Sequence, residues 1–120
     1  MIQSQLISDQ NYQIQYYNDE NKFSLYGALT FNNVEKYNEL FHFIYNNAEK
    51  INGILTIDLS GIKQINSSGL AALCLIVIKM KDFKIPVNIV VEKYSLWHRS
   101  SLHELQQLNE NVEIEYLVFH

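Results

Sequence analysis

The stretch from Ile54 to Lys81 constrains the fold of this chain more than any other part, because it joins a short apolar strand to a long apolar helix. Its first residues, ILTIDL, are aliphatic and β-branched and have the length of a buried strand. Ser60-Gly61 interrupts this run, and the segment from Leu70 to Lys81 is too long and too continuous for a second strand. The order of strand, loop and helix indicates one unit of an α/β fold.

Polar residues stand where this helix begins. Asn66, Ser67 and Ser68 precede the apolar segment. Asn and Ser are preferred at helix starts because their side-chain oxygens accept hydrogen bonds from N–H groups of the first turn. The same N–H groups, together with the positive end of the helix dipole, favour an anion. A serine here can therefore serve as a cap, as a phosphate acceptor, or as both.

The residues from Asp58 to Leu73, DLSGIKQINSSGLAAL, resemble the central motif of the STAS domain, the fold of bacterial anti-sigma-factor antagonists. That motif runs through a strand, Asp-Leu-Ser, a short loop, Asp-Ser-Ser-Gly-Leu and an apolar helix. This chain departs from the commonest form by having Asn66 in place of Asp. The resemblance implies that the first serine after this position, Ser67, is the one phosphorylated, and Ser68 is the alternative.

The resemblance further implies a cytoplasmic regulatory module that binds a protein. A serine kinase of the anti-sigma type would phosphorylate Ser67, a serine phosphatase would restore it, and only the unmodified form would bind the partner. The resemblance implies a role in transcription regulation, and the sequence leaves the pathway output open. The predicted contact surface consists of the helix start and a neighbouring loop, with the residues Asn66, Ser67, Ser68, Gly69, Leu70, Thr30, Phe31, Asn32 and Asn33.

A second functional class stays open at this stage. STAS-like proteins also resemble small accessory subunits of lipid-transport ATP-binding-cassette complexes, in which the central helix docks on the ATPase as a structural part. In that case the chain would be a scaffold that does not depend on phosphorylation. Indifference of a stable complex to Ser67→Asp would favour this alternative.

The rest of the chain predicts a small sheet with helices on it. After a polar leader, residues 12–16 and 23–27 alternate apolar and polar side chains and predict a hairpin. Asn32 and Glu35 have the spacing of a capping box, and apolar residues then recur at helical spacing as far as Ile51. Further strands are predicted at 86–91 and 112–118, with a short helix between them.

These elements predict an α/β fold with a small mixed β-sheet of about five strands, an N-terminal hairpin followed by β-α-β units, and helices packed against the sheet. The STAS resemblance implies the same architecture, as a single domain over residues 1–120. The central helix is apolar around most of its circumference, so either it is covered on more than one side or part of it is an exposed partner-binding surface.

Composition excludes several classes of protein. A net charge of −4 and a pI near 5.5 argue against a nucleic-acid-binding surface. The longest apolar run, Leu70 to Ile78, is about half of what a bilayer span needs, so no membrane insertion is expected. The N-terminus, Met1 to Gln5, does not resemble a signal peptide. The single cysteine, Cys74, indicates a core residue in a reducing cytoplasm.

Catalytic and metal-binding motifs are absent from the sequence. There is no Gly-rich phosphate loop, no paired-cysteine metal site and no Gly-x-Ser-x-Gly motif. His98 and His103 are five residues apart, a spacing that does not place two ligands on one helical face, and His42 flanks an apolar stripe. Asp58 is interpreted as a turn-forming carboxylate before Ser60. We therefore predict a non-enzyme without metal or cofactor, whose partner and oligomeric state the sequence leaves open.

Overall fold

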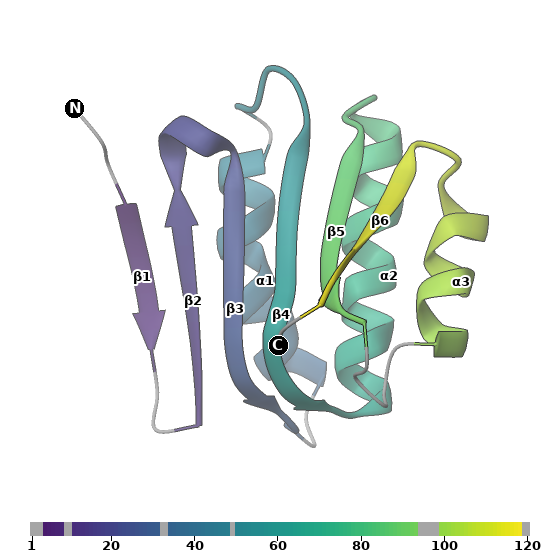
Figure 1. Cartoon of the computed structure of the whole chain (residues 1–120). Coiled ribbons are helices and arrows are strands. Elements are labelled where there is room, and N and C mark those ends of the chain that lie inside the picture. The colour runs from purple at the N-terminus through teal and green to yellow at the C-terminus, as the bar shows by residue number, and fades with distance from the viewer. Residues whose placement is uncertain (1–3, 9–10, 32–33, 49, 94–98, 119–120) are drawn as a thin grey trace.

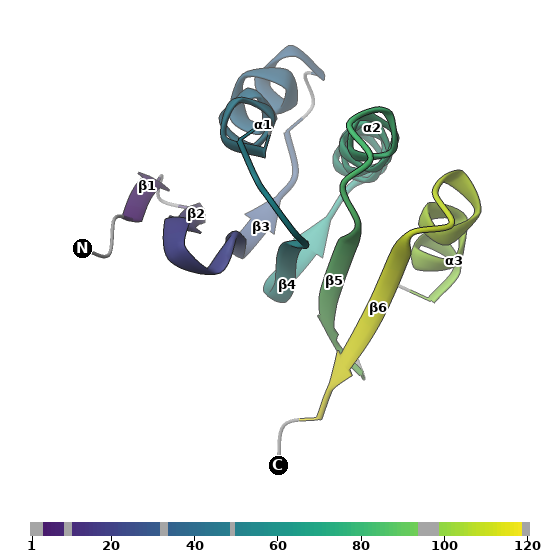
Figure 2. The same cartoon turned by 90° about the horizontal axis from the view of Figure 1, so that it is seen from above.

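The computed structural model describes residues 4–8, 11–31, 34–48, 50–93 and 99–118. Within these residues the chain forms a six-stranded sheet, with its strands side by side in chain order, and three α-helices (Figure 1). All three helices lie on the same face of the sheet (Figure 2). The expected α/β fold with a small mixed sheet is confirmed, and the sheet has one strand more than the sequence indicated.

The N-terminal half of the sheet is antiparallel. It consists of β1 (Ser4–Ser8), β2 (Tyr12–Tyr17) and β3 (Lys22–Leu29), with the 3-10 helix η1 (Asn18–Glu20) between β2 and β3. The predicted hairpin is therefore present, with Ile14 opposite Leu25. The additional strand, β1, comes from the polar leader and pairs with β2 through its backbone. Its five residues are too few to show a reliable alternation in the sequence.

The rest of the chain alternates helices with parallel strands. The elements are α1 (Val34–Ala48), β4 (Leu55–Ile65), α2 (Ser67–Asp82), β5 (Val87–Glu92), α3 (Arg99–Leu108) and β6 (Val112–Leu117). Each of β4, β5 and β6 pairs in parallel with the strand before it in the sheet. Parallel strands place all their carboxyl ends at one edge of the sheet, so the loops that follow β3 and β4 lie close together.

β4 is longer than the sequence predicted. Ser60 and Gly61 were expected to end the strand, but pairing with β3 continues as far as Ile65. Between Ser24 and Tyr26 the partner on β4 advances from Asp58 to Gly61, so β4 has one extra residue there, which is a β-bulge. The bulge accommodates the polar residues without ending the strand.

The hydrophobic core lies between the sheet and the helices. β4 shows the simplest pattern, because Leu55, Ile57 and Leu59 are buried while the residues between them are half-buried on the other face. α1 contributes Tyr37, Phe41 and Ile44 to the core, each at most 1% exposed. This packing places α1 and α2 side by side on one face of the sheet (Figure 2).

α2 has two different faces. Its inner face is buried and consists of Gly69, Ala72, Leu73, Ile76, Val77 and Met80. On its outer face Leu75 is 48% and Ile78 is 38% exposed. The helix is covered on more than one side, by the sheet, α1 and α3, as one of the two predictions required, and part of its outer face is exposed, as the other required.

Candidate functional site

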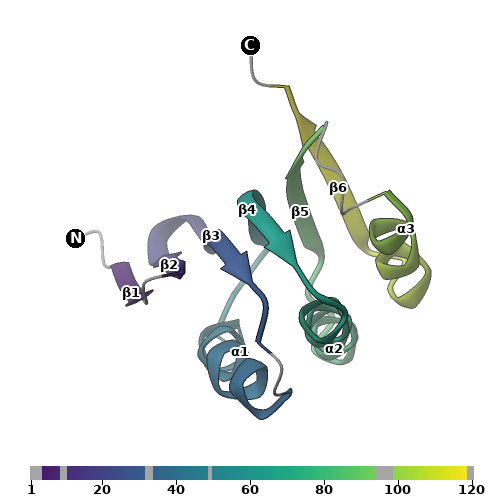
Figure 3. The same ribbon diagram turned by 90° about the horizontal axis from the view of Figure 1, so that it is seen from below.

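The predicted contact residues that the structure describes gather at the carboxyl ends of β3 and β4, the edge at which α/β folds commonly place their sites. Thr30 and Phe31 follow β3, and Asn66 follows β4. The backbone N–H of Asn66 donates to the carbonyl of Leu29 at 3.0 Å, which joins the two strand ends directly. Figure 3 views the molecule from this end and shows β3 and β4 leading toward α1 and α2.

Asn66, one of the three polar residues that the sequence offered as a cap, caps α2. Its backbone is extended, and its side-chain oxygen Oδ1 accepts a hydrogen bond from the N–H of Gly69 at 2.9 Å. The same oxygen accepts a hydrogen bond from the hydroxyl of Tyr37 at 2.8 Å, and the amide nitrogen Nδ2 donates a hydrogen bond to the carbonyl of Phe31 at 2.7 Å. One side chain thus connects α2, α1 and the loop after β3. Below, Asn66, Tyr37, Phe31 and Gly69 are called the Asn66 network.

Tyr37 is a part of this site that the sequence analysis missed. It belongs to the apolar residues that recur at helical spacing between Glu35 and Ile51, and its side chain is fully buried. Its hydroxyl nevertheless donates to Asn66 and accepts the N–H of Phe31 at 3.2 Å. Burial raises the pKa of Tyr37, and the hydrogen bond from Phe31 lowers it in part. A buried tyrosine hydroxyl requires a partner, which is the signal that could have indicated this role.

The ring of Phe31 is held by other aromatic rings. It makes edge contacts with Tyr12, at 5.2 Å between ring centroids, and with Tyr37, at 4.9 Å. The ammonium group of Lys36 lies 5.7 Å from the centre of the Phe31 ring. Phe31 is therefore fixed through its backbone and through its side chain. The neighbouring predicted residues Asn32 and Asn33, and with them the predicted capping box, lie outside the described residues.

The two candidate phosphoacceptors differ in exposure. Ser67, the first residue of α2, is exposed, whereas Ser68 is half-buried. Thr30 is also exposed, and Leu70 is half-buried against the core. An enzyme that modifies a hydroxyl must reach it, so this arrangement favours Ser67 over Ser68.

Gly69 is buried because two neighbours approach its backbone closely. A Cβ at this position would lie 2.6 Å from Cγ1 of Ile65 and 3.0 Å from the hydroxyl of Tyr37. The first distance is shorter than real carbon contacts, so a side chain here would displace Ile65 and press on the Asn66 network. Glycine at this position thus allows α1 and α2 to approach each other at the site.

Asp58 has a structural role in β4. Its Oδ1 accepts the N–H of Ser60 at 2.9 Å and the hydroxyl of Ser60 at 2.6 Å, and its Oδ2 lies 3.8 Å from Nζ of Lys22. The expectation of a local carboxylate contact with Ser60 is confirmed, but the contact stabilises a bulge within the strand rather than a turn after it.

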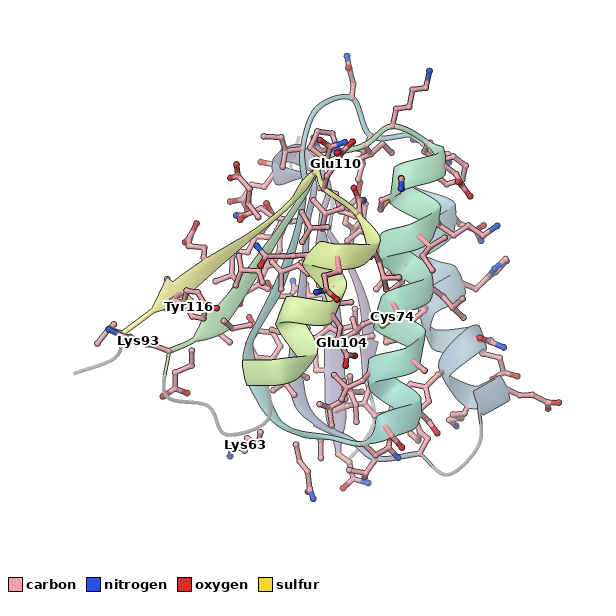
Figure 4. All side chains as sticks on the ribbon, turned by 90° about the vertical axis from the view of Figure 1, so that its right-hand side faces the viewer. Lys63, Cys74, Lys93, Glu104, Glu110 and Tyr116 are labelled. Atoms are coloured by element: carbon pink, nitrogen blue, oxygen red, sulfur yellow. The ribbon has the colours of Figure 1, made fainter. Side chains whose placement is uncertain are left out.

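The structure gives no support to a metal centre or a reactive thiol. The described residues contain no group of three or more His, Cys, Asp or Glu side chains that could hold a metal ion. Cys74 on α2 and Glu104 on α3 face the same interhelical space (Figure 4). Burial raises the pKa of the Cys74 thiol, and the negative charge of Glu104 raises it further. Since the thiolate is the reactive form, Cys74 is suited to packing rather than to chemistry.

A groove of about 530 Å³ lies at the other end of the sheet. Its lining includes Ile54, Pro86 and Asn111, each of which directly precedes a parallel strand. In Figure 4, Glu110 marks this end and Lys63, near the carboxyl end of β4, marks the opposite one. We call this feature the acidic groove because its lining contains four carboxylates, those of Glu20, Glu110, Glu113 and Glu115.

The fold resembles that of solved structures. SiaC of Pseudomonas aeruginosa matches with a TM-score of 0.71 and 14% sequence identity, over 98% of this chain and 99% of that chain. A chain in the crystal structure of the diguanylate cyclase SiaD in complex with its activator SiaC, from the same organism, matches with a TM-score of 0.70 and 14% identity, over 96% of this chain and 99% of that chain. No model of a protein family matches the sequence, and no curated protein sequence matches it.

The fold is STAS-like. This confirms the fold that the motif from Asp58 to Leu73 implied, and the match extends over almost the whole of both chains. The matched structures contain an activator protein. No helix in the described part of the chain is long and apolar enough to cross a membrane.

Proposed function

We propose that this chain is a cytoplasmic regulatory protein-binding module, not an enzyme, and that phosphorylation of Ser67 switches its binding to a protein partner. The observation that carries the proposal is the position of Ser67: it is exposed at the first residue of α2, directly beside Asn66, which holds Phe31 in the loop after β3. A partner that contacts this surface contacts the hydroxyl as well.

The chemistry of the switch follows from charge. A phosphoryl group would add a charge of about −1.5 to −2 at this helix start. The positive end of the α2 dipole offsets part of the electrostatic cost, so the fold is retained. A partner that covers Ser67 would have to accommodate the same charge at its interface. Release of the partner by repulsion is therefore an output that needs no refolding. The enzymes that this requires are a serine kinase of the anti-sigma type and a serine phosphatase.

A second candidate for the bound partner is supported by a comparison. SiaC is an activator in complex with a diguanylate cyclase, and this chain shares its fold. We therefore propose two classes of partner for the same surface, a kinase of the anti-sigma type and a nucleotide cyclase. The exposure of Ser67 fits both, since in both cases the modification would control access to the surface.

The experiment is intact-mass measurement and site mapping of the protein purified from its native cells, together with the protein that copurifies. We expect phosphate on Ser67, and a partner bound to the unmodified fraction. Ser67→Ala should abolish the modification, while Ser68→Ala, the matched control in the same helical turn, should retain it. Absence of phosphate in every growth condition, with a stoichiometric partner still bound, would overturn the switch and favour the scaffold alternative.

A further inference from the structure

The side-chain amide of Asn66 makes one contact that a carboxylate cannot make. Its oxygen accepts from Gly69 and Tyr37, and its nitrogen donates to the carbonyl of Phe31. The N–H of Gly69 and the carbonyl of Phe31 fix the orientation of the amide. In the reversed orientation the amide nitrogen would face the Gly69 N–H, donor against donor, and the amide oxygen would face the Phe31 carbonyl, acceptor against acceptor. The cap at Gly69 requires the oxygen alone. The contact with Phe31 requires the N–H group.

The contacts among Asn66, Phe31 and Tyr37 close into a ring. Asn66 donates to the Phe31 carbonyl, the Phe31 N–H donates to the Tyr37 hydroxyl, and that hydroxyl donates back to Asn66. Both backbone groups of Phe31 are therefore bound by side chains from α1 and from the start of α2. Each member orients the next, so the ring fixes where the loop lies relative to the helix.

We propose that Asn66 is a positioning residue that holds Thr30 and Phe31 in a fixed place beside Ser67, and that this requires a neutral amide rather than an acid. Aspartate at this position would keep the cap, since Asp and Asn are about equally good at helix starts. It would place a carboxylate oxygen against the Phe31 carbonyl, where two acceptors repel each other. The loop would then be free to move away from the helix start.

The consequence for binding rests on the proposed function. If the surface that contains Thr30, Phe31 and Ser67 binds a partner, a loop that is already in place avoids the entropic cost of ordering it on association. Asn66 would then raise the affinity without touching the partner. The positioning itself belongs to the free protein, and it stands or falls independently of any partner or kinase.

The test is residue-resolved amide hydrogen exchange on the free full-length chain with Asn66→Asp. We expect the Phe31 N–H to exchange roughly tenfold faster, the equivalent of one hydrogen bond, while the Gly69 N–H stays protected by the cap. Asn88→Asp is the matched control, because it makes the same change in an amide on the sheet, away from the loop. It should leave Phe31 unchanged.

A pH series separates this role from a general loss of packing. Protonation of the new carboxyl at position 66 restores an O–H donor, so the protection of Phe31 in Asn66→Asp should recover toward the wild-type value at acidic pH. Asn66→Ser keeps a capping oxygen but is too short to reach the Phe31 carbonyl, so the protection of the Phe31 N–H should be lost at every pH. This variant also replaces Asn66→Asp in the test if the aspartate variant does not fold. Unchanged protection of Phe31 in a folded Asn66 variant would overturn the proposal. Failure to detect phosphate on Ser67 would overturn the proposed function alone.

Discussion

The polar side chains at the two ends of the sheet differ in how closely they are hydrogen-bonded. At the carboxyl ends of β3 and β4, the Asn66 network pairs donors with acceptors at 2.7–3.2 Å around a fully buried Tyr37. At the amino ends of β4, β5 and β6, the acidic groove contains four exposed carboxylates. Among these, Glu115 accepts a hydrogen bond from the side-chain amide of Asn88 at 3.5 Å. Matched, partly buried polar groups fix geometry, whereas exposed like charges create a field without fixing a position.

Removal of the Asn66 side chain should have the largest effect on stability, at the end of the sheet that carries the Asn66 network. Asn66→Ala deletes the α2 cap and leaves the Tyr37 hydroxyl and the Phe31 carbonyl without this partner. We expect the free energy of unfolding to fall by about 2–4 kcal/mol, from the cost of a lost cap plus unpaired polar groups. Urea unfolding followed by circular dichroism measures it. A loss below about 1 kcal/mol would mean that the two ends do not differ in this way.

Deletion of one hydroxyl within the network should cost less. Tyr37→Phe keeps the buried ring but removes the acceptor of the Phe31 N–H and one donor to Asn66. We expect a loss of about 1–3 kcal/mol in the free energy of unfolding, measured by the same method. Tyr26→Phe is the matched control, because the Tyr26 side chain is 41% exposed, and it should stay within about 0.5 kcal/mol of the wild type.

The same hydroxyl predicts a dependence on alkaline pH. The pKa of Tyr37 is raised above 10.0 in the folded protein because the ring is buried, so the unfolded state loses this proton first. The stabilisation is fully present below pH 10.0 and is lost as pH rises through the folded pKa. Unfolding measured from neutral to alkaline pH should show a steeper loss in the wild type than in Tyr37→Phe. Equal slopes would contradict the assignment.

A small increase in volume at the helix start should have a moderate effect. Gly69→Ala places a methyl group 2.6 Å from Ile65 Cγ1 and close to the Tyr37 hydroxyl. Overpacking costs about 1–3 kcal/mol, and about 1 kcal/mol of this is offset by the higher helix propensity of alanine. We expect a net destabilisation of about 1 kcal/mol, with faster hydrogen exchange at Phe31. A more stable variant would show that the contact between α1 and α2 can relax.

The smallest effect is expected at the acidic groove. Glu113→Gln with Glu115→Gln removes two exposed charges from one strand and should change the free energy of unfolding by no more than about 0.5 kcal/mol at moderate salt. At low salt, where like charges repel over a longer range, we expect the double variant to be the more stable protein. The comparison is a salt series of unfolding midpoints. A large loss of stability would mean that these carboxylates have fixed partners.

The sequence by itself determined the types of the α-helices and of the strands other than β1, the α/β class and the place of the helix start. Aliphatic runs, helical periodicity and the residues around Asn66 are local signals, and the strand, the cap and the helix follow from them because each depends on neighbours a few residues away. The resemblance of the residues from Asp58 to Leu73 to the STAS motif implied Ser67 as a candidate phosphoacceptor, and the structure shows Ser67 exposed.

The tertiary structure decided what distant segments do to one another. Ser60 and Gly61 form part of a bulge rather than a strand end, because pairing with β3 outweighs their local preference for a turn. The donor role of Asn66 toward Phe31, 35 residues away, and the role of the Tyr37 hydroxyl, 29 residues from Asn66, exist only when β3, α1 and α2 are assembled. A local pattern specifies which groups need partners, and the packed fold specifies which partners they find.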